Sequence, residues 1–192
     1  MTLPFFTIGH STRRTEEFIS LLRLAEVELV ADVRTVPKSR TNPQYNKDAL
    51  PRDLEAFQIG YRHLPALGGL RSRSKETAPE VNGFWQNASF HNYADHALTQ
   101  EFQAGLETLI EIGRERRCAI MCAEAVWWRC HRRIIADHLL ARGEEVFHLM
   151  GSDRVEPAQL TKGAQVQAKG TVVYPGSPGT RHREPVAPPD GD

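Results

Sequence analysis

The three cysteines of the chain, Cys118, Cys122 and Cys130, lie close together, and His131 directly follows the last of them. An odd number in one cluster excludes a disulfide scaffold and leaves packing, metal binding or a reactive thiol. Cys122 ends an apolar run just before a predicted helix, where the helix dipole and free backbone N–H groups favour a thiolate. We expect Cys122 to be a nucleophile with a pKa below that of free cysteine, and simple packing explains this cysteine equally well.

Proton transfer at such a thiol requires a neighbouring acid or base, and two candidates lie close in the sequence. His131 has a normal pKa near neutrality, and Glu124 follows Cys122 by two positions. We expect Cys130 and His131 to lie in the first turn of a helix that begins near Arg129. We assign Cys130 to substrate binding. The alternative for His131 is a hydrogen-bonded structural histidine.

Two further apolar runs turn polar at their ends, at His10-Ser11 and at Asp32-Val-Arg34. Charges at the end of a buried strand are costly unless they are paired or used, which favours a site role for Asp32. Asp32 and Arg34 also point to the same side of a strand, so an ion pair between them is the alternative. We expect His10 and Asp32 to orient groups in the site, and Ser11 and Arg34 to bind substrate.

The loop after Arg34 adds cations and hydroxyl groups that suit a phosphate or carboxylate. We assign Ser39, Arg40 and, from the later helix, Arg132 to substrate binding. Surface charge kept for solubility is the alternative explanation. Aromatic residues such as Trp85 and Phe90 could stack a ring, although packing roles are commoner. The predicted ligand is therefore a small anionic or nucleotide-like molecule.

The same side chains contain enough N, S and O atoms for zinc, but the spacing from Cys122 to Cys130 matches no standard ligand pattern. We predict no metal site and no cofactor. The chain has neither the glycine fingerprint of dinucleotide-binding enzymes nor a Walker loop. A tyrosine phosphatase is rejected because Arg129 follows Cys122 by seven positions instead of six.

These residues must be positioned by an alternation of short apolar runs and amphipathic segments. Strands are predicted at residues 5–8, 27–33, 59–64, 118–122 and 146–150. Helices are predicted at residues 15–25, 47–57, 100–112 and 129–141. Runs that are apolar throughout indicate parallel strands covered by helices on both faces. The fold class is therefore α/β, a single Rossmann-like three-layer sandwich with a mostly parallel sheet of about five strands.

In an open parallel sheet, ligands bind at the carboxyl ends of the strands, so the candidate residues should converge on one concave site. We expect an α/β core domain at residues 1–150. A C-terminal extension at 151–175 can form a β-hairpin through Gln165-Val-Gln and Thr171-Val-Val-Tyr. The Pro- and Gly-rich tail at 176–192 is expected to be disordered.

Composition narrows the function classes. The chain has 192 residues, 24 Lys plus Arg and 24 Asp plus Glu, so its net charge is zero. This balance gives no global field for a nucleic acid, which leaves only a local patch for such a partner. No window is apolar enough for a membrane span, and the N-terminus lacks the features of a signal peptide, so we expect a cytoplasmic protein. The sequence gives no indication of the oligomeric state.

Several motifs of the chain resemble the uncharacterised family called domain of unknown function 488. The resemblance implies a compact α/β fold and a shared polar cluster, and it covers roughly residues 5 to 150. Many members carry a proline in the loop where this chain has Trp127-Trp128. The motifs are Ile8-Gly9-His10-Ser11, Ala31-Asp32-Val33-Arg34, Pro37-Lys38-Ser39-Arg40, Leu67-Gly68-Gly69, Met121-Cys122-Ala123-Glu124 and Cys130-His131-Arg132.

Together these features predict an enzyme with a reactive cysteine and an anion-binding site, either a hydrolase or a transferase. The catalytic candidates are Cys122, Glu124, His131, Asp32 and His10. The alternative is a non-catalytic module that binds a nucleotide or nucleic acid at the same edge of the sheet, with Cys122 and Cys130 as packing residues.

Overall fold

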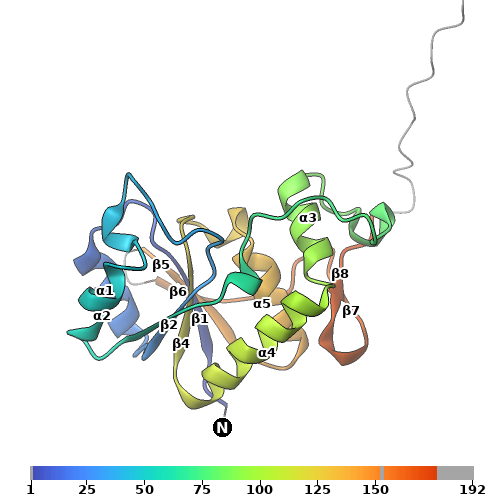
Figure 1. The fold of residues 1–192 in the computed structure, drawn as a ribbon. Helices are drawn as coiled ribbons and strands as arrows, with labels where there is room; N and C mark the ends of the chain where they lie inside the picture. The colour runs from blue at the N-terminus through green and yellow to red at the C-terminus, as the bar shows by residue number, and fades with distance from the viewer. Residues whose placement is uncertain (1, 152–153, 177–192) are drawn as a thin grey trace, which may run out of the picture.

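The computed structural model describes residues 2–151 and 154–176 (Figure 1). The predicted tail from residue 177 onward lies outside the described residues. The strands are β1 (Phe5–Gly9), β2 (Leu29–Asp32), β3 (Gly60–His63), β4 (Cys118–Cys122), β5 (Val146–Met150), β6 (Arg154–Pro157), β7 (Gln165–Val166) and β8 (Val172–Val173). The α-helices are α1 (Thr15–Leu24), α2 (Leu50–Glu55), α3 (Ala88–His96), α4 (Gln100–Glu115) and α5 (Arg132–Ala141).

The central sheet has six strands in the order β3-β2-β4-β1-β5-β6. Its first five strands are parallel, and β6 pairs antiparallel with β5. The strands from β1 to β5 alternate with helices along the chain, as parallel pairing requires. The predicted α/β sandwich with a mostly parallel sheet is confirmed.

Helices cover both faces of this sheet (Figure 1). On one face α1 and α2 pack against alternate strand residues, including Ile8, Val30 and Met121. On the other face α3, α4, α5 and the strand β8 cover the remaining set, including Ile120 and Cys122. Because side chains alternate along a strand, Met121 and Cys122 point to opposite layers. The Cys122 side chain therefore lies in the layer formed by α3, α4 and α5.

Three elements differ from the sequence predictions. Helix α3 lies where no helix was predicted. Its Asn87 cap accepts hydrogen bonds from the backbone N–H groups of Ser89 and Phe90. Strand β6 extends the sheet where no strand was predicted. Helix α5 begins at Arg132 and not near Arg129, because the chain first makes a 3-10 turn over Trp127–Arg129.

The region after β5 also packs on the core. The predicted hairpin is present as the antiparallel pair β7 and β8. Beyond it, the Tyr174 hydroxyl donates a hydrogen bond to Asp137 Oδ2 of α5 at 2.7 Å. The proposed domain boundary at residue 150 stays a prediction.

Within the described residues, no helix has both the length and the apolar content that crossing a membrane requires.

Candidate functional site

The carboxyl ends of three adjacent strands are joined by backbone hydrogen bonds beyond the regular pairing. The His10 and Ser11 N–H groups donate to the carbonyl oxygens of Cys122 and Ala123, both at 2.9 Å. The Val33 N–H donates to Met121 O at 3.0 Å. The segments that follow β1, β2 and β4 are therefore held side by side at one edge of the sheet.

The first group at this edge is an arginine cluster, formed by His10, Asp32, Arg34, Tyr45 and Tyr61. Arg34 makes a bidentate ion pair with Asp32, with Nη2 2.6 Å from Oδ2 and Nε 2.9 Å from Oδ1. Asp32 is fully buried, and Arg34 is 7% exposed. The Tyr61 hydroxyl donates to Asp32 Oδ2 at 2.6 Å, and Arg34 Nη2 also donates to Tyr45 O at 2.6 Å. The ion pair is thus buried and saturated with hydrogen bonds.

His10 completes this cluster as a neutral imidazole. Its Nε2 lies 3.2 Å from Arg34 Nη1 and its Nδ1 lies 2.8 Å from Ser11 O, so Nε2 accepts a hydrogen bond and Nδ1 donates one. Its ring stacks on Tyr45 with centroids 4.2 Å apart. Burial lowers the pKa of His10 to about 4, against the smaller opposing effect of its bond to Ser11. His10 therefore carries no charge near neutral pH.

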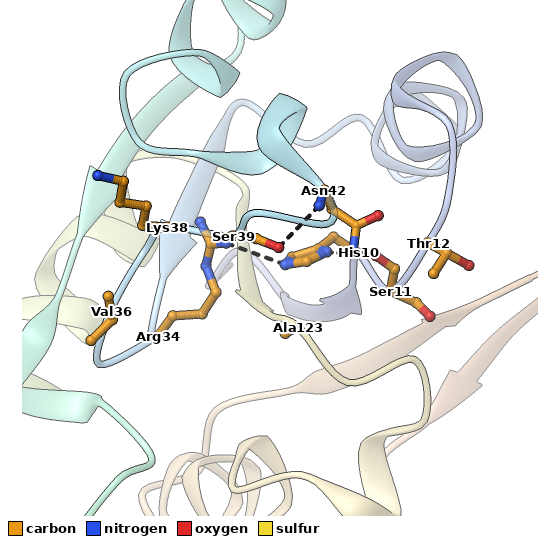
Figure 2. Close-up of a pocket in the computed structure, with 9 residues that line it drawn as sticks. All are labelled: His10, Ser11, Thr12, Arg34, Val36, Lys38, Ser39, Asn42 and Ala123. Atoms are coloured by element: carbon orange, nitrogen blue, oxygen red, sulfur yellow. Dashed lines mark hydrogen bonds between the residues drawn. The ribbon is translucent and has the colours of Figure 1, made fainter.

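A cavity of about 360 Å³ opens beside this cluster (Figure 2). Figure 2 shows His10 between Arg34 and Ser11, with Ser39 and Asn42 on the loop that crosses above them. The Asn42 N–H donates to Ser39 Oγ at 3.0 Å. His10, which was predicted to orient groups, and the predicted binding residues Ser11, Arg34 and Ser39 therefore line the same cavity. We call this space the His10 cavity.

The second group is a cysteine cluster, formed by Cys122, Cys130, His131 and Arg132. The two sulfurs lie 2.6 Å apart, and each cysteine is almost fully buried. Cys130 Sγ lies 3.5 Å from His131 Nδ1 and 3.4 Å from Arg132 Nε. The backbone N–H of Arg132 also points at this sulfur, at 3.5 Å. Cys130 thus has three neighbouring groups that favour its thiolate.

The orientation of His131 is fixed from both sides. Its Nε2 lies 2.9 Å from the carbonyl oxygen of Val33, which can only accept, so Nε2 carries a proton. In the neutral ring Nδ1 is then an acceptor, and it faces Cys130. Gly69 packs against the same ring, because a Cβ at Gly69 would come within 2.5 Å of Nδ1. This contact gives a physical reason for the second glycine of the Leu67-Gly68-Gly69 motif.

Arg132 is a buried cation with an unusual set of partners. It is 1% exposed, and its Nη2 donates to the Glu124 carbonyl oxygen at 2.6 Å. Among the described residues no carboxylate forms an ion pair with it. The Glu124 carbonyl also lies against Gly9, where a Cβ would come within 1.8 Å of its oxygen. The contacts of Arg132 that can become negative are therefore the cysteine sulfurs.

The pKa values of the two thiols move in opposite directions. Burial raises the pKa of Cys122 well above its usual range, and its hydrogen bond to Cys130 adds to the effect. Burial alone would also raise the pKa of Cys130. The hydrogen bond from Cys122, together with His131 and Arg132, holds that pKa well below its usual range instead.

The sequence prediction of a lowered pKa at Cys122 is therefore wrong in direction. The reason is burial, which raises the pKa of the Cys122 thiol, together with its hydrogen bond to Cys130. In addition, α5 begins only at Arg132, so Cys130 and His131 precede the helix instead of lying in its first turn. The free N–H at the helix start then reaches Cys130, and Cys122 is left as the donor in the pair. The start of α5 therefore faces Cys130, through the Arg132 N–H at 3.5 Å, and not Cys122.

Both cysteines line a second space of about 390 Å³, which we call the cysteine cavity. Arg34 lies on the boundary between the two cavities and lines both. The lining of the cysteine cavity also includes Leu70, which is 76% exposed, and Phe90, whose ring stacks on Trp85. The cavity is thus lined by both cationic and apolar side chains.

The remaining predicted residues differ in whether they line one of the two cavities. Glu124 and His131 line the cysteine cavity, but only the backbone carbonyl of Glu124 contacts Cys122, at 3.9 Å. Asp32 and Arg132 are buried beneath the cavities and line neither. Arg40 is exposed and lines neither cavity, so its role in binding stays a prediction.

Sequence reasoning missed the tyrosines that surround Asp32 and Arg34. Tyr61 reaches Asp32 from the neighbouring strand β3, and Tyr45 reaches Arg34 from a 3-10 turn. No local pattern connects these residues to the site, since each depends on strand order or loop path. Gly69 could have been found, because two adjacent glycines beside a predicted site indicate close packing.

Within the described part of the chain, no group of three or more His, Cys, Asp or Glu side chains is arranged to hold a metal ion.

A family model described as Domain of unknown function DUF488 matches residues 14–139 of the chain. This range includes both cysteines of the cysteine cluster and most of the arginine cluster. No curated protein and no solved structure matches the chain.

Proposed function

The chain belongs to the family described as Domain of unknown function DUF488, and we propose that it is an enzyme whose cysteine thiolate attacks a small anionic or nucleotide-like substrate. The substrate occupies the cysteine cavity, and Cys130 is the nucleophile. The reaction class is hydrolysis or group transfer through a covalent thiol adduct.

The observation that carries this proposal is the buried guanidinium of Arg132, whose only ionisable hydrogen-bond partner among the described residues is sulfur. A buried charge without a partner is strongly destabilising, so the site favours an anion next to Arg132. Cys130 Sγ lies 3.4 Å from Arg132 Nε and supplies that anion as its thiolate. A cysteine kept only for packing gives no reason to bury a cation against it.

The neighbours of Cys130 supply the other requirements of nucleophilic catalysis. The free Nδ1 of His131 accepts the thiol proton, and the imidazolium then stabilises the thiolate. The same proton is available to the leaving group as the adduct forms. Cys122 donates a hydrogen bond to the thiolate, and Gly69 holds the His131 ring in place.

The walls of the cavity favour the proposed substrate class. Arg34 and Arg129 line the cavity, and the exposed guanidinium of Arg129 can bind a carboxylate or phosphate group. Phe90 and Leu70 add apolar surface, which suits a ring or a short hydrocarbon. A ligand with an anionic end and a flat or apolar end fits this combination.

The proposal is tested by alkylating the full chain near neutral pH with two reagents, iodoacetate and iodoacetamide, and locating the label by mass spectrometry. Cys130 should react at least about tenfold faster than Cys118, because each unit of pKa depression raises the thiolate fraction about tenfold. Burial raises the pKa of Cys118 to about 12, so Cys118 is the internal reference. The ratio of the rate with iodoacetate to the rate with iodoacetamide should be higher for Cys130 than for free cysteine.

The Arg132→Met variant sharpens this test, because it should lower the rate at Cys130 about tenfold or more. Arg133→Gln is the matched control, since its guanidinium lies over Trp85 and contacts neither sulfur. If Cys130 and Cys122 react no faster than Cys118, the nucleophile is excluded and the non-catalytic binding module is favoured.

A further inference from the structure

The two sulfurs of the cysteine cluster are closer than unbonded sulfur atoms normally come. Cys122 Sγ and Cys130 Sγ lie 2.6 Å apart, whereas a sulfur–sulfur bond is about 2.05 Å long. Both cysteines are free thiols. A shift of roughly half an ångström would therefore join them.

The backbone holds each sulfur at this position. Cys122 is the last residue of β4, and the carbonyl oxygen of Cys122 accepts the His10 N–H at 2.9 Å. Cys130 closes the 3-10 turn, with its N–H donating to Trp127 O at 3.1 Å. The short loop between them thus has both ends fixed, and no refolding is needed to bring the thiols together.

The pair is also polarised, which single-thiol nucleophilic catalysis does not require. Cys130 faces His131 and Arg132, whereas Cys122 faces Cys130 and the Glu124 carbonyl. One thiol is therefore prepared to attack, and the other keeps its proton beside it. Thiol–disulfide exchange needs this division between an attacking and a resolving cysteine.

We propose that Cys130 and Cys122 form a dithiol centre that reduces small disulfides bearing a carboxylate or other anionic group. The proposal rests on Cys130 being the attacking thiolate, as in the proposed function. It adds a second activity, and it also provides a means to block the nucleophile reversibly. The exposed Arg129, which lines the cysteine cavity, selects the anionic group.

The exchange takes place in two steps. The Cys130 thiolate attacks one sulfur of the substrate disulfide, so a mixed disulfide forms and the first substrate thiolate leaves. Cys122 then attacks Cys130 Sγ as its proton passes to the second leaving thiolate. The first thiolate takes the proton that His131 accepted from Cys130. In total two protein thiols are oxidised to a disulfide, and one substrate disulfide is reduced to two thiols.

The test mixes the native full chain with dithiobis(nitrobenzoate), an aromatic disulfide with a carboxylate on each ring that releases a coloured thiolate. The expected result is two coloured thiolates for each chain and no nitrobenzoate left on the protein. Mass spectrometry should then find Cys122 joined to Cys130, and dithiothreitol should restore both thiols.

Two variants separate the steps. Cys122→Ser should release one coloured thiolate and retain one nitrobenzoate on Cys130, because no resolving thiol remains. Cys118→Ala is the matched control, and it should behave like the native chain because Cys118 is buried inside β4. Both variants are compared with the native chain by circular dichroism.

A native chain that retains the nitrobenzoate on Cys130 overturns the dithiol centre. If Cys130 is still alkylated rapidly by iodoacetate in that case, the proposed nucleophile survives alone. A native chain in which neither cysteine reacts overturns both proposals.

Discussion

The arginine cluster and the cysteine cluster lie side by side at the ends of the same strands, yet the buried guanidinium in each has different partners. Arg34 has a carboxylate at 2.6 Å, and a tyrosine hydroxyl binds the same carboxylate oxygen. Arg132 has a backbone carbonyl, a threonine hydroxyl and sulfur. The first cluster is neutral as a pair, and the second becomes neutral only when a thiol ionises.

This difference separates positioning from reactivity. A saturated, buried ion pair resists rearrangement because each partner would be left uncompensated if the other moved. Arg34 therefore fixes the wall between the two cavities. Arg132 forms no ion pair with a carboxylate among the described residues, so its charge favours the thiolate of Cys130. The neighbouring clusters thus combine a rigid wall with a polarised thiol, as preorganised sites require.

The largest expected effect comes from breaking the saturated pair. Asp32→Asn leaves Arg34 buried without a carboxylate and should lower the free energy of unfolding by about 3 to 5 kcal/mol. Urea denaturation followed by circular dichroism measures this change. Tyr61→Phe is the control, because it removes one hydrogen bond and should lower the free energy by about 1 kcal/mol. A smaller loss for Asp32→Asn than for Tyr61→Phe would show that the pair does not hold the fold.

A second effect follows from the neutral His10 in the arginine cluster. Its pKa of about 4 in the folded chain lies below the value of about 6.5 expected after unfolding. The unfolded chain therefore takes up the proton first as the pH falls. The stabilising contribution is complete above about pH 6.5 and declines as the pH approaches 4. The decline reaches about 3 kcal/mol at pH 4.

His10→Phe keeps a ring that can stack on Tyr45 and removes the titrating group. The variant should be less stable than the native chain at pH 7, because Arg34 loses an acceptor, and this deficit should shrink toward pH 4. Urea denaturation at several pH values measures both curves. Parallel curves for the two proteins would contradict a depressed His10 pKa.

The smallest expected effect concerns the contact between Gly69 and His131 in the cysteine cluster. Gly69→Ala introduces a Cβ against His131 Nδ1 and should shift the ring away from Cys130. We expect Cys130 alkylation near neutral pH to slow about threefold to tenfold, which corresponds to a rise of half to one unit in its pKa. Ser72→Ala, in the exposed part of the same loop, should leave the rate unchanged. An unchanged rate in Gly69→Ala would show that His131 does not depend on this contact.

Much of the fold follows from local pattern. The apolar runs that become β1, β2, β4 and β5 are buried on both faces, which is the signature of parallel strands under helices. Helix α3 and strand β6 were not predicted. Helix α3 is short and follows a long segment without a clear hydrophobic period. Strand β6 is short, and pairing with β5 determines it more than its own residues do.

The candidate site was also partly predictable. Polar residues that directly follow strands of one parallel sheet share an edge, so the proximity of His10, Arg34 and Cys122 follows from the order of elements. The tyrosines around Asp32 come from other parts of the chain and gave no signal. Their positions depend on which strand lies beside β2 and on where the following loop crosses.

The amino-acid sequence is enough to predict the parallel α/β architecture and the chemical types at the strand ends, because both follow from short-range periodicity. It does not show which of the two cysteines has a lowered pKa. That difference depends on where α5 begins and on which sulfur the buried Arg132 contacts. The pKa of a buried group is set by a few contacts within several ångströms, and only the tertiary structure fixes those contacts.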